Sequence, residues 1–201
     1  MGTRNLICVM QNEEYKVAQY ASTNGYPSRQ GVRILHILRN EETVKKLKEN
    51  LKKCRWISPA ELKICRKNVG YKPNEPIVPC IPCDTDKFSE TYPHLTGDTG
   101  ASVLELIAES TNGLNLIDSL EFGKNSLFCE WAYVVDFDKN TFEVYKGLNQ
   151  APVDSSERFY FDGACDKYGY YSVRFLKSFD LSNLPTDEEF ISSCKAADAT
   201  E

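Results

Sequence analysis

The N-terminus of this 201-residue chain has the pattern of a β-hairpin, and that pattern constrains the fold more than any other segment. Leu6 to Met10 and Tyr15 to Tyr20 are rich in β-branched and aromatic residues and are separated by a polar break at 11–14. Turn residues from Asn24 to Pro27 then end the second run. Because a chain that begins with a core strand holds its terminus in place, we expect the sheet to be built around this hairpin.

The centre of the sheet is predicted at Leu127 to Val135, where every residue except Glu130 is apolar. A strand that apolar is covered on both faces, so it belongs in the middle of its sheet. A turn at 138–140 and the run Thr141 to Tyr145 make this strand the first half of a second hairpin. Alternating residues at 170–179 indicate a further strand. These patterns predict an α+β fold with an antiparallel sheet core flanked by helices.

Helices are expected on either side of these strands, from apolar residues at spacings of three and four. Ser58 with Glu61, and Thr186 with Glu189, have the spacing of capping boxes at helix starts. The end of the chain from Ala196 lacks apolar anchors and is expected to be frayed. We therefore expect one domain over 1–195 followed by a frayed tail at 196–201. The predicted helices cover 31–39, 42–54, the residues after Ser58, the residues after Gly100, and the residues after Thr186.

Charge is unevenly distributed along the chain. The net charge is −5, which disfavours a protein that coats nucleic acid or an anionic membrane over its whole surface. Residues 31–72 nevertheless hold 12 Lys and Arg against 4 Asp and Glu. Prolines at three-residue intervals from Pro73 to Pro82 forbid regular helix after this segment. We expect a peripheral helical basic insertion at about 41–84, and the alternatives for its lysines are a solvated helix face or contact with nucleic acid.

Location and cofactors follow from what the sequence lacks. It has no run of eighteen apolar residues and no signal peptide, so we expect a soluble cytoplasmic protein without a membrane partner. Eight cysteines are then expected to be reduced rather than paired in disulfides. No cofactor is predicted. The alternative is a structural zinc ion held by Cys54, Cys65, Cys80 and Cys83, in which the last two have the spacing of a zinc knuckle.

One charged residue stands inside the most apolar run. Glu130 would be a buried carboxylate there, and a buried charge requires a partner. Arg4, which also lies near a strand start, is the candidate. We therefore expect Arg4, Glu130 and Tyr20 to converge on one side of the sheet near the N-terminus.

Several motifs stand out along the chain, namely Thr3-Arg4-Asn5-Leu6, Val17-Ala18-Gln19-Tyr20, Gly25-Tyr26-Pro27 with Gly31, Ser126 to Asp136, and Phe142 to Gly147. Together they resemble a family of uncharacterised fungal, bacterial and phage proteins that open with Thr-Arg-Asn/Gly-Leu. The resemblance covers about the first forty residues and the last hundred, and leaves the basic insertion out. Some relatives open with Cys-Thr-Arg and carry an Asp before Tyr-Pro, which is similar to choloylglycine-type N-terminal-nucleophile amidohydrolases.

The resemblance implies a fold like an N-terminal-nucleophile hydrolase sandwich but weakens the catalytic inference. Gly2 stands at the position of the nucleophilic Cys and Asn24 at that of the Asp. Glycine has no side-chain nucleophile. We therefore expect a non-catalytic protein that binds a small molecule or a protein partner through Arg4, Tyr20, Asn24, Tyr26 and Glu130. The alternative is an amidohydrolase that uses Thr3 or Cys8.

Overall fold

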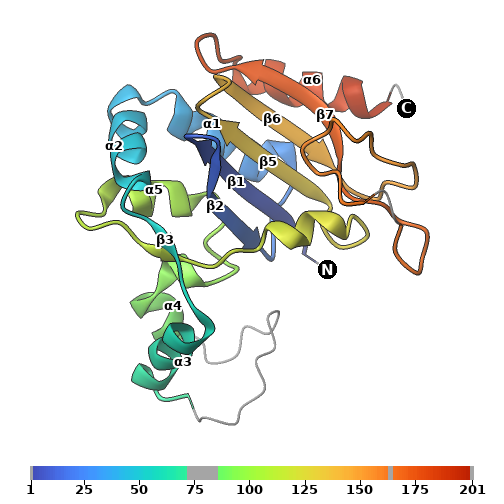
Figure 1. The fold of residues 1–201 in the computed structure, drawn as a ribbon. Coiled ribbons are helices and arrows are strands. Elements are labelled where there is room, and N and C mark those ends of the chain that lie inside the picture. The colour runs from blue at the N-terminus through green and yellow to red at the C-terminus, as the bar shows by residue number, and fades with distance from the viewer. Residues whose placement is uncertain (1, 72–85, 163–164, 200–201) are drawn as a thin grey trace.

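Five strands form one mixed sheet in the order β2-β1-β5-β6-β7 (Figure 1). The computed structural model describes residues 2–71, 86–162 and 165–199. The expected α+β class is confirmed. The strands of the sheet are β1 (Asn5–Gln11), β2 (Glu14–Ala21), β5 (Trp131–Asp136), β6 (Thr141–Lys146) and β7 (Arg174–Asp180).

Both predicted hairpins are present, and one carboxylate joins their turns. In the first turn Asn12 and Glu13 have φ values of 58° and 62°, as a tight hairpin turn requires. The backbone N–H groups of these two residues donate to the Asp138 carboxylate over 2.9 and 2.8 Å. Asp138 lies in the β5–β6 turn, so the two hairpins are tied together at this end of the sheet.

The predicted antiparallel sheet is wrong at one pairing. β1 and β5 run parallel, with Asn5 opposite Trp131, while the other three pairings are antiparallel. β2 has already returned the chain to the end of the sheet where β1 begins, and residues 22–130, called the crossover below, lead from that end to the start of β5 on the other side of β1. The apolar run that marked β5 as central carries no information on its direction. β5 is nevertheless the middle strand, as predicted, and all six of its residues are buried.

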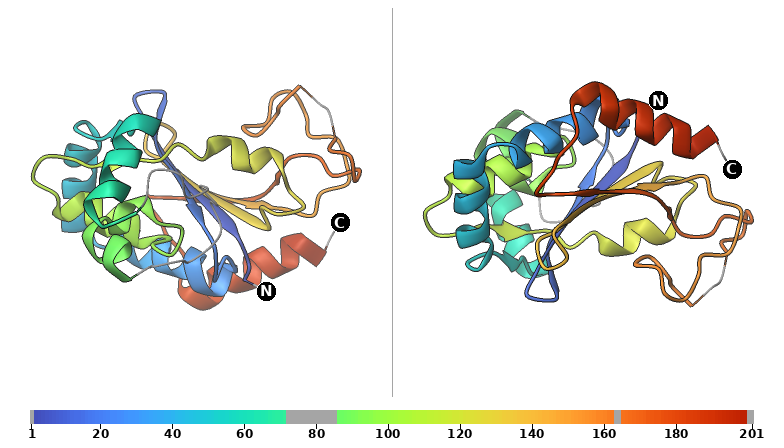
Figure 2. Two further views of the ribbon diagram at one scale, coloured as in Figure 1. Left: turned by 90° about the horizontal axis from the view of Figure 1, so that it is seen from below. Right: turned by 90° about the horizontal axis from the view of Figure 1, so that it is seen from above.

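The two faces of the sheet have different covers (Figure 2). One face carries Ile7, Val9 and Tyr133, and helices α1 and α6 pack on it. Leu6 and Cys8 point to the other face, which is covered by the short helix η3 and by the irregular segment after β6. Because side chains alternate along each strand, they pack into two hydrophobic cores, one on each face of the sheet.

The crossover contains most of the helices. A π-helical turn, η1, leads directly into α1, and Gly31 at their junction lies against Phe190 of α6. A Cβ at Gly31 would come within 2.7 Å of the Phe190 ring. The remaining elements are η1 (Pro27–Gly31), α1 (Val32–Leu38), α2 (Glu41–Leu51), β3 (Arg55–Trp56), α3 (Pro59–Asn68), α4 (Asp86–Thr91), η2 (Pro93–Leu95), α5 (Ser102–Glu109), β4 (Asn115–Leu116), η3 (Leu120–Lys124) and α6 (Asp187–Ala199).

Helix α2 belongs to the core, which corrects the prediction that the whole basic insertion is peripheral. Leu47 and Leu51 are fully buried in the core on the α1 face. Asn50 beside them donates to the carbonyl oxygens of Ile107 and Ser110 at the end of α5, over 3.1 and 2.7 Å. The narrow apolar stripe of α2 is therefore sufficient to anchor it.

Helix α3 fits the peripheral prediction better. It buries none of its residues, and its Ile64 is 58% exposed. The predicted capping box of Ser58 and Glu61 is present and starts the helix. The extended connection predicted at 71–84 lies outside the described residues, apart from Tyr71.

The C-terminal helix is longer than expected. Thr186 and Glu189 form the predicted capping contacts, and α6 then runs to Ala199. Asp198 pairs with Lys146 across 3.1 Å, so residues 196–199 are helical and make contacts, while fraying of the tail stays a prediction. No helix among the described residues is both long and apolar enough to cross a membrane.

The two halves of the insertion should respond differently to truncation. Leu47→Ala removes a fully buried side chain, so we expect the free energy of unfolding to fall by about 2–5 kcal/mol. Ile64→Ala on α3 is the matched control and should change it by less than about 0.5 kcal/mol. Urea unfolding measures both. Equal, small effects would show that α2 is as peripheral as the sequence predicted.

Candidate functional site

The predicted partners Arg4 and Glu130 are neighbours at the end of the sheet where β1 and β5 begin. The Glu130 N–H donates to the Arg4 carbonyl over 3.1 Å, and the Arg4 N–H lies 3.4 Å from Oε1 of Glu130. Their side chains form no ion pair, because the Arg4 guanidinium stacks 4.7 Å from the centre of the Phe128 ring. Both residues are half-buried and precede their strands, so Glu130 is not the buried strand carboxylate that the sequence indicated.

The other predicted binding residues lie around the same end. Tyr20 is the register partner of Leu6, and alternation places Arg4 on that same face of the sheet. The Tyr20 ring meets the edge of Phe122 at 4.9 Å between centroids. Asn24 is exposed with a φ of 59°, and Tyr26 is 52% exposed. The five residues therefore gather at one end of the sheet, but they do not all face one space.

The two alternative nucleophiles are poorly placed for attack on a substrate. Thr3 is 6% exposed, and its carbonyl accepts a hydrogen bond of 2.9 Å from the Gly25 N–H. Cys8 is fully buried in the core under η3. Burial raises the pKa of the Cys8 thiol well above its ordinary value, so the reactive thiolate is disfavoured.

Thiol labelling should separate these cysteines. In the native protein we expect iodoacetamide to modify the exposed Cys165, and to reach Cys8 and Cys129 only after denaturant unfolds the chain. Peptide mapping by mass spectrometry gives the labelling of each residue. Labelling of native Cys8 as fast as that of Cys165 would restore Cys8 as a nucleophile candidate.

Only two of the four cysteines proposed as zinc ligands lie among the described residues. Cys54 accepts a hydrogen bond of 3.4 Å from the Leu114 N–H, and burial raises the pKa of its thiol. Cys65 lies half-buried on α3. Cys80 and Cys83 fall outside the described residues. Among residues 2–71, 86–162 and 165–199, no group of three or more His, Cys, Asp or Glu is arranged to hold a metal ion.

A buried ionic cluster, which the sequence reasoning missed, lies under the segment after β6. Arg158 from that segment contacts Asp136 over 2.7 Å and Glu143 over 2.8 Å. The Tyr145 hydroxyl donates to the same Glu143 carboxylate over 2.7 Å. The side chain of Asp136 is 1% exposed and that of Arg158 11%. The sequence does contain one signal for this cluster, because a charged residue, Glu143, stands between the apolar Phe142 and Val144 in a predicted strand.

Each charged group of the cluster has a bonded partner, and we interpret the cluster as structural. Burial opposes ionisation of Asp136 and Glu143, but hydrogen bonds and the Arg158 charge outweigh it and lower the pKa of both carboxyls. Both are therefore ionised at neutral pH and bound to one guanidinium, so neither carboxyl carries a proton to donate as an acid. Arg158 instead pins the irregular segment after β6 onto the sheet.

Removing this arginine should leave two buried charges unpaired. We expect Arg158→Met to lower the free energy of unfolding by about 3–5 kcal/mol at neutral pH. In the wild type the two lowered pKa values favour folding above about pH 4 and lose that effect below it. In the variant both pKa values rise, so its deficit should shrink as the pH falls from neutral toward the new values.

Urea unfolding at neutral and mildly acidic pH measures this dependence. Arg55→Met, which breaks the exposed pair with Glu61, is the matched control and should have little effect at either pH. A variant as stable as the wild type at neutral pH would show that the cluster does not hold the segment.

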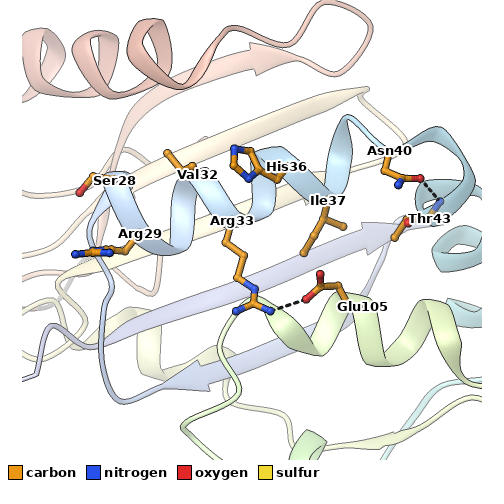
Figure 3. Close-up of a pocket in the computed structure, with 9 residues that line it drawn as sticks. All are labelled: Ser28, Arg29, Val32, Arg33, His36, Ile37, Asn40, Thr43 and Glu105. Atoms are coloured by element: carbon orange, nitrogen blue, oxygen red, sulfur yellow. Dashed lines mark hydrogen bonds and ion pairs between the residues drawn. The ribbon is translucent and has the colours of Figure 1, made fainter.

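The surface is hollowed along α1, and none of the predicted site residues lines this hollow. A hollow of about 470 Å³ is bounded by η1, α1, the start of α2, and α5 (Figure 3). Arg33 reaches from α1 to Glu105 on α5, and their charged groups lie 2.7 Å apart. Arg29 on the π-helical turn forms no ion pair or side-chain hydrogen bond with the described residues. The lining residues are Ser28, Arg29, Val32, Arg33, His36, Ile37, Asn40, Thr43 and Glu105.

Comparison of the chain with protein-family models, with curated proteins and with solved structures found no match. The α+β fold with its five-stranded mixed sheet is therefore the level at which the protein is classified. The likeness to N-terminal-nucleophile hydrolases stays a prediction.

Proposed function

We propose that the protein is a non-catalytic binding protein that holds a small anionic molecule in the hollow along α1. The observation that carries this proposal is Arg29, a cation without a partner among the described residues at the wall of a hollow of about 470 Å³. Sites for small molecules commonly enclose about 300–1,000 Å³. A guanidinium there offers several N–H donors to a carboxylate or phosphate.

The second arginine gives the hollow its selectivity. Arg33 lies four residues after Arg29 and is held by Glu105. An anionic ligand that reaches Arg33 competes with that carboxylate. A weak or singly charged ligand therefore gains little binding free energy from Arg33. A ligand with two acidic groups can bind both arginines. Val32 and Ile37 in the same lining provide apolar contact for the body of the ligand.

The non-catalytic part of the proposal rests on the two nucleophile candidates. Thr3 and Cys8 are both buried, and neither lines the hollow along α1. Gly2 brings no side chain to the end of the sheet where the resemblance would place the nucleophile. The amidohydrolase alternative therefore has less support than binding. Contact with nucleic acid through the basic insertion stays a prediction of the sequence.

Titration with defined anions tests this function. With citrate and adenosine monophosphate as probes, Arg29→Gln should weaken binding about tenfold, since it removes a charge-assisted contact. Glu105→Gln should instead strengthen binding, because it frees the Arg33 guanidinium for the probe without adding a cationic side chain to the hollow. Isothermal titration calorimetry at constant ionic strength measures both changes.

Arg66→Gln on α3 is the control, because it makes the same chemical change far along the chain from the hollow. Its affinity for each probe should equal that of the wild type. Equal losses for the Arg29 and Arg66 variants would mean that the probes sense only overall charge. A failure of Glu105→Gln to tighten binding would remove Arg33 from the site.

A further inference from the structure

A second surface, at the end of the sheet where β1 and β5 begin, exposes large apolar side chains. Phe128 is 39% exposed and Leu148 is 51% exposed, and both flank the half-buried pair Arg4 and Glu130. Aromatic residues and arginine are the types enriched in protein interfaces. We refer to Arg4, Phe128, Glu130 and Leu148 as the N-terminal surface.

Backbone contacts join the segments that carry these residues. The Gly147 N–H donates to the Glu130 carbonyl over 2.9 Å, and the Leu148 N–H donates to the Ser126 carbonyl over 2.8 Å. Phe128 lies between these two anchor points in sequence and carries the Arg4 guanidinium on its ring. The loops before β5 and after β6 and the start of β1 therefore form one continuous patch.

Leu148 is held outward at a conformational cost. Its φ is 56°, in the left-handed region that residues other than glycine, asparagine and aspartate seldom adopt. A leucine there pays about 1 kcal/mol relative to an ordinary backbone. Its side chain is half exposed, so the fold of the single chain gains no core packing in return. The position is explained if the side chain is buried in an assembly.

The patch carries one positive and one negative side chain, so it is complementary in charge to a second copy of itself. Arg4 and Glu130 have opposite signs and adjacent backbones, yet neither side chain forms an ion pair with another described residue. Two copies related by a twofold axis can place Arg4 of each opposite Glu130 of the other. A closed pair of this kind uses one patch twice, and its apolar centre would bury Phe128 and Leu148.

We propose that the N-terminal surface binds a second copy of this chain in a twofold-symmetric pair. The proposal is independent of the anion site, because no residue of the N-terminal surface lines the hollow along α1. A different protein partner would need its own matching charges, and it would leave the chain monomeric by itself.

Charge exchange tests the pairing directly. The wild type should sediment as a dimer in analytical ultracentrifugation, with tags kept off the N-terminus. Arg4→Glu and Glu130→Arg should each weaken self-association at least about tenfold, because each places like charges opposite one another. An equimolar mixture of the two variants should restore the dimer, since each copy then meets the opposite charge at both contacts.

Apolar substitutions test the centre of the patch without relying on charge. Leu148→Asn suits the left-handed backbone and should fold normally, yet it should weaken the dimer at least about tenfold. Ile64→Asn on α3 is the control, because its side chain is similarly exposed outside the patch. The proposal is overturned if the wild type is monomeric at all concentrations, or if the mixed charge variants stay monomeric.

Discussion

The parallel pairing of β1 with β5 is the constraint on which the rest of the structure depends. β2 brings the chain back to the end of the sheet where β1 begins, so residues 22–130 must pass across that end of β1 before β5 can pair with it on the other side. Helices α1, α2 and α5 of this crossover bury their apolar faces in the core on the side of Ile7, Val9 and Tyr133, whereas η3 lies on the opposite face. These core helices, the hollow along α1 and the exposed helix α3 all belong to this one segment.

The opposite face of the sheet is closed by different physics. No long helix among the described residues covers it, and an irregular segment lies there instead. Irregular backbone cannot satisfy its own polar groups, so side chains anchor it. Arg158 binds two strand carboxylates, while Asn149 reaches the carbonyl oxygens of Ala151 and Ser172. Ion pairs and hydrogen bonds therefore add to the apolar packing of Phe159 in holding this segment on the sheet.

Local patterns in the sequence were sufficient for much of this fold. Two runs of β-branched and aromatic residues around a polar break identified the hairpin of Leu6 and Tyr20. The apolar run identified the central strand, because burial on both faces requires apolar residues at every position. The capping box of Ser58 is likewise a short-range signal. Each of these depends on residues within a few positions of one another.

Long-range features were not readable in this way. Strand direction between β1 and β5 is set by the whole crossover and not by either strand. Arg158 meets Asp136 only because an irregular segment folds back across the sheet, and its sequence neighbourhood resembles any polar loop. The hollow along α1 depends on how far α5 stands from α1, so Arg29 looked like one more surface cation. Glu130 was predicted as a site residue instead, because it is the one charged residue in the apolar run from Leu127 to Val135.

Asp138 has a consequence for how such a chain can vary in length. Its carboxylate closes the turn of a hairpin from which it is separated by the entire crossover. The entropy lost on closing a loop grows only with the logarithm of its length, and doubling the loop costs about 0.6 kcal/mol. Insertions at exposed points of the crossover therefore add very little to the entropic cost of forming this contact. The sheet can stay constant in evolution while the crossover it supports is lengthened, shortened or replaced in part.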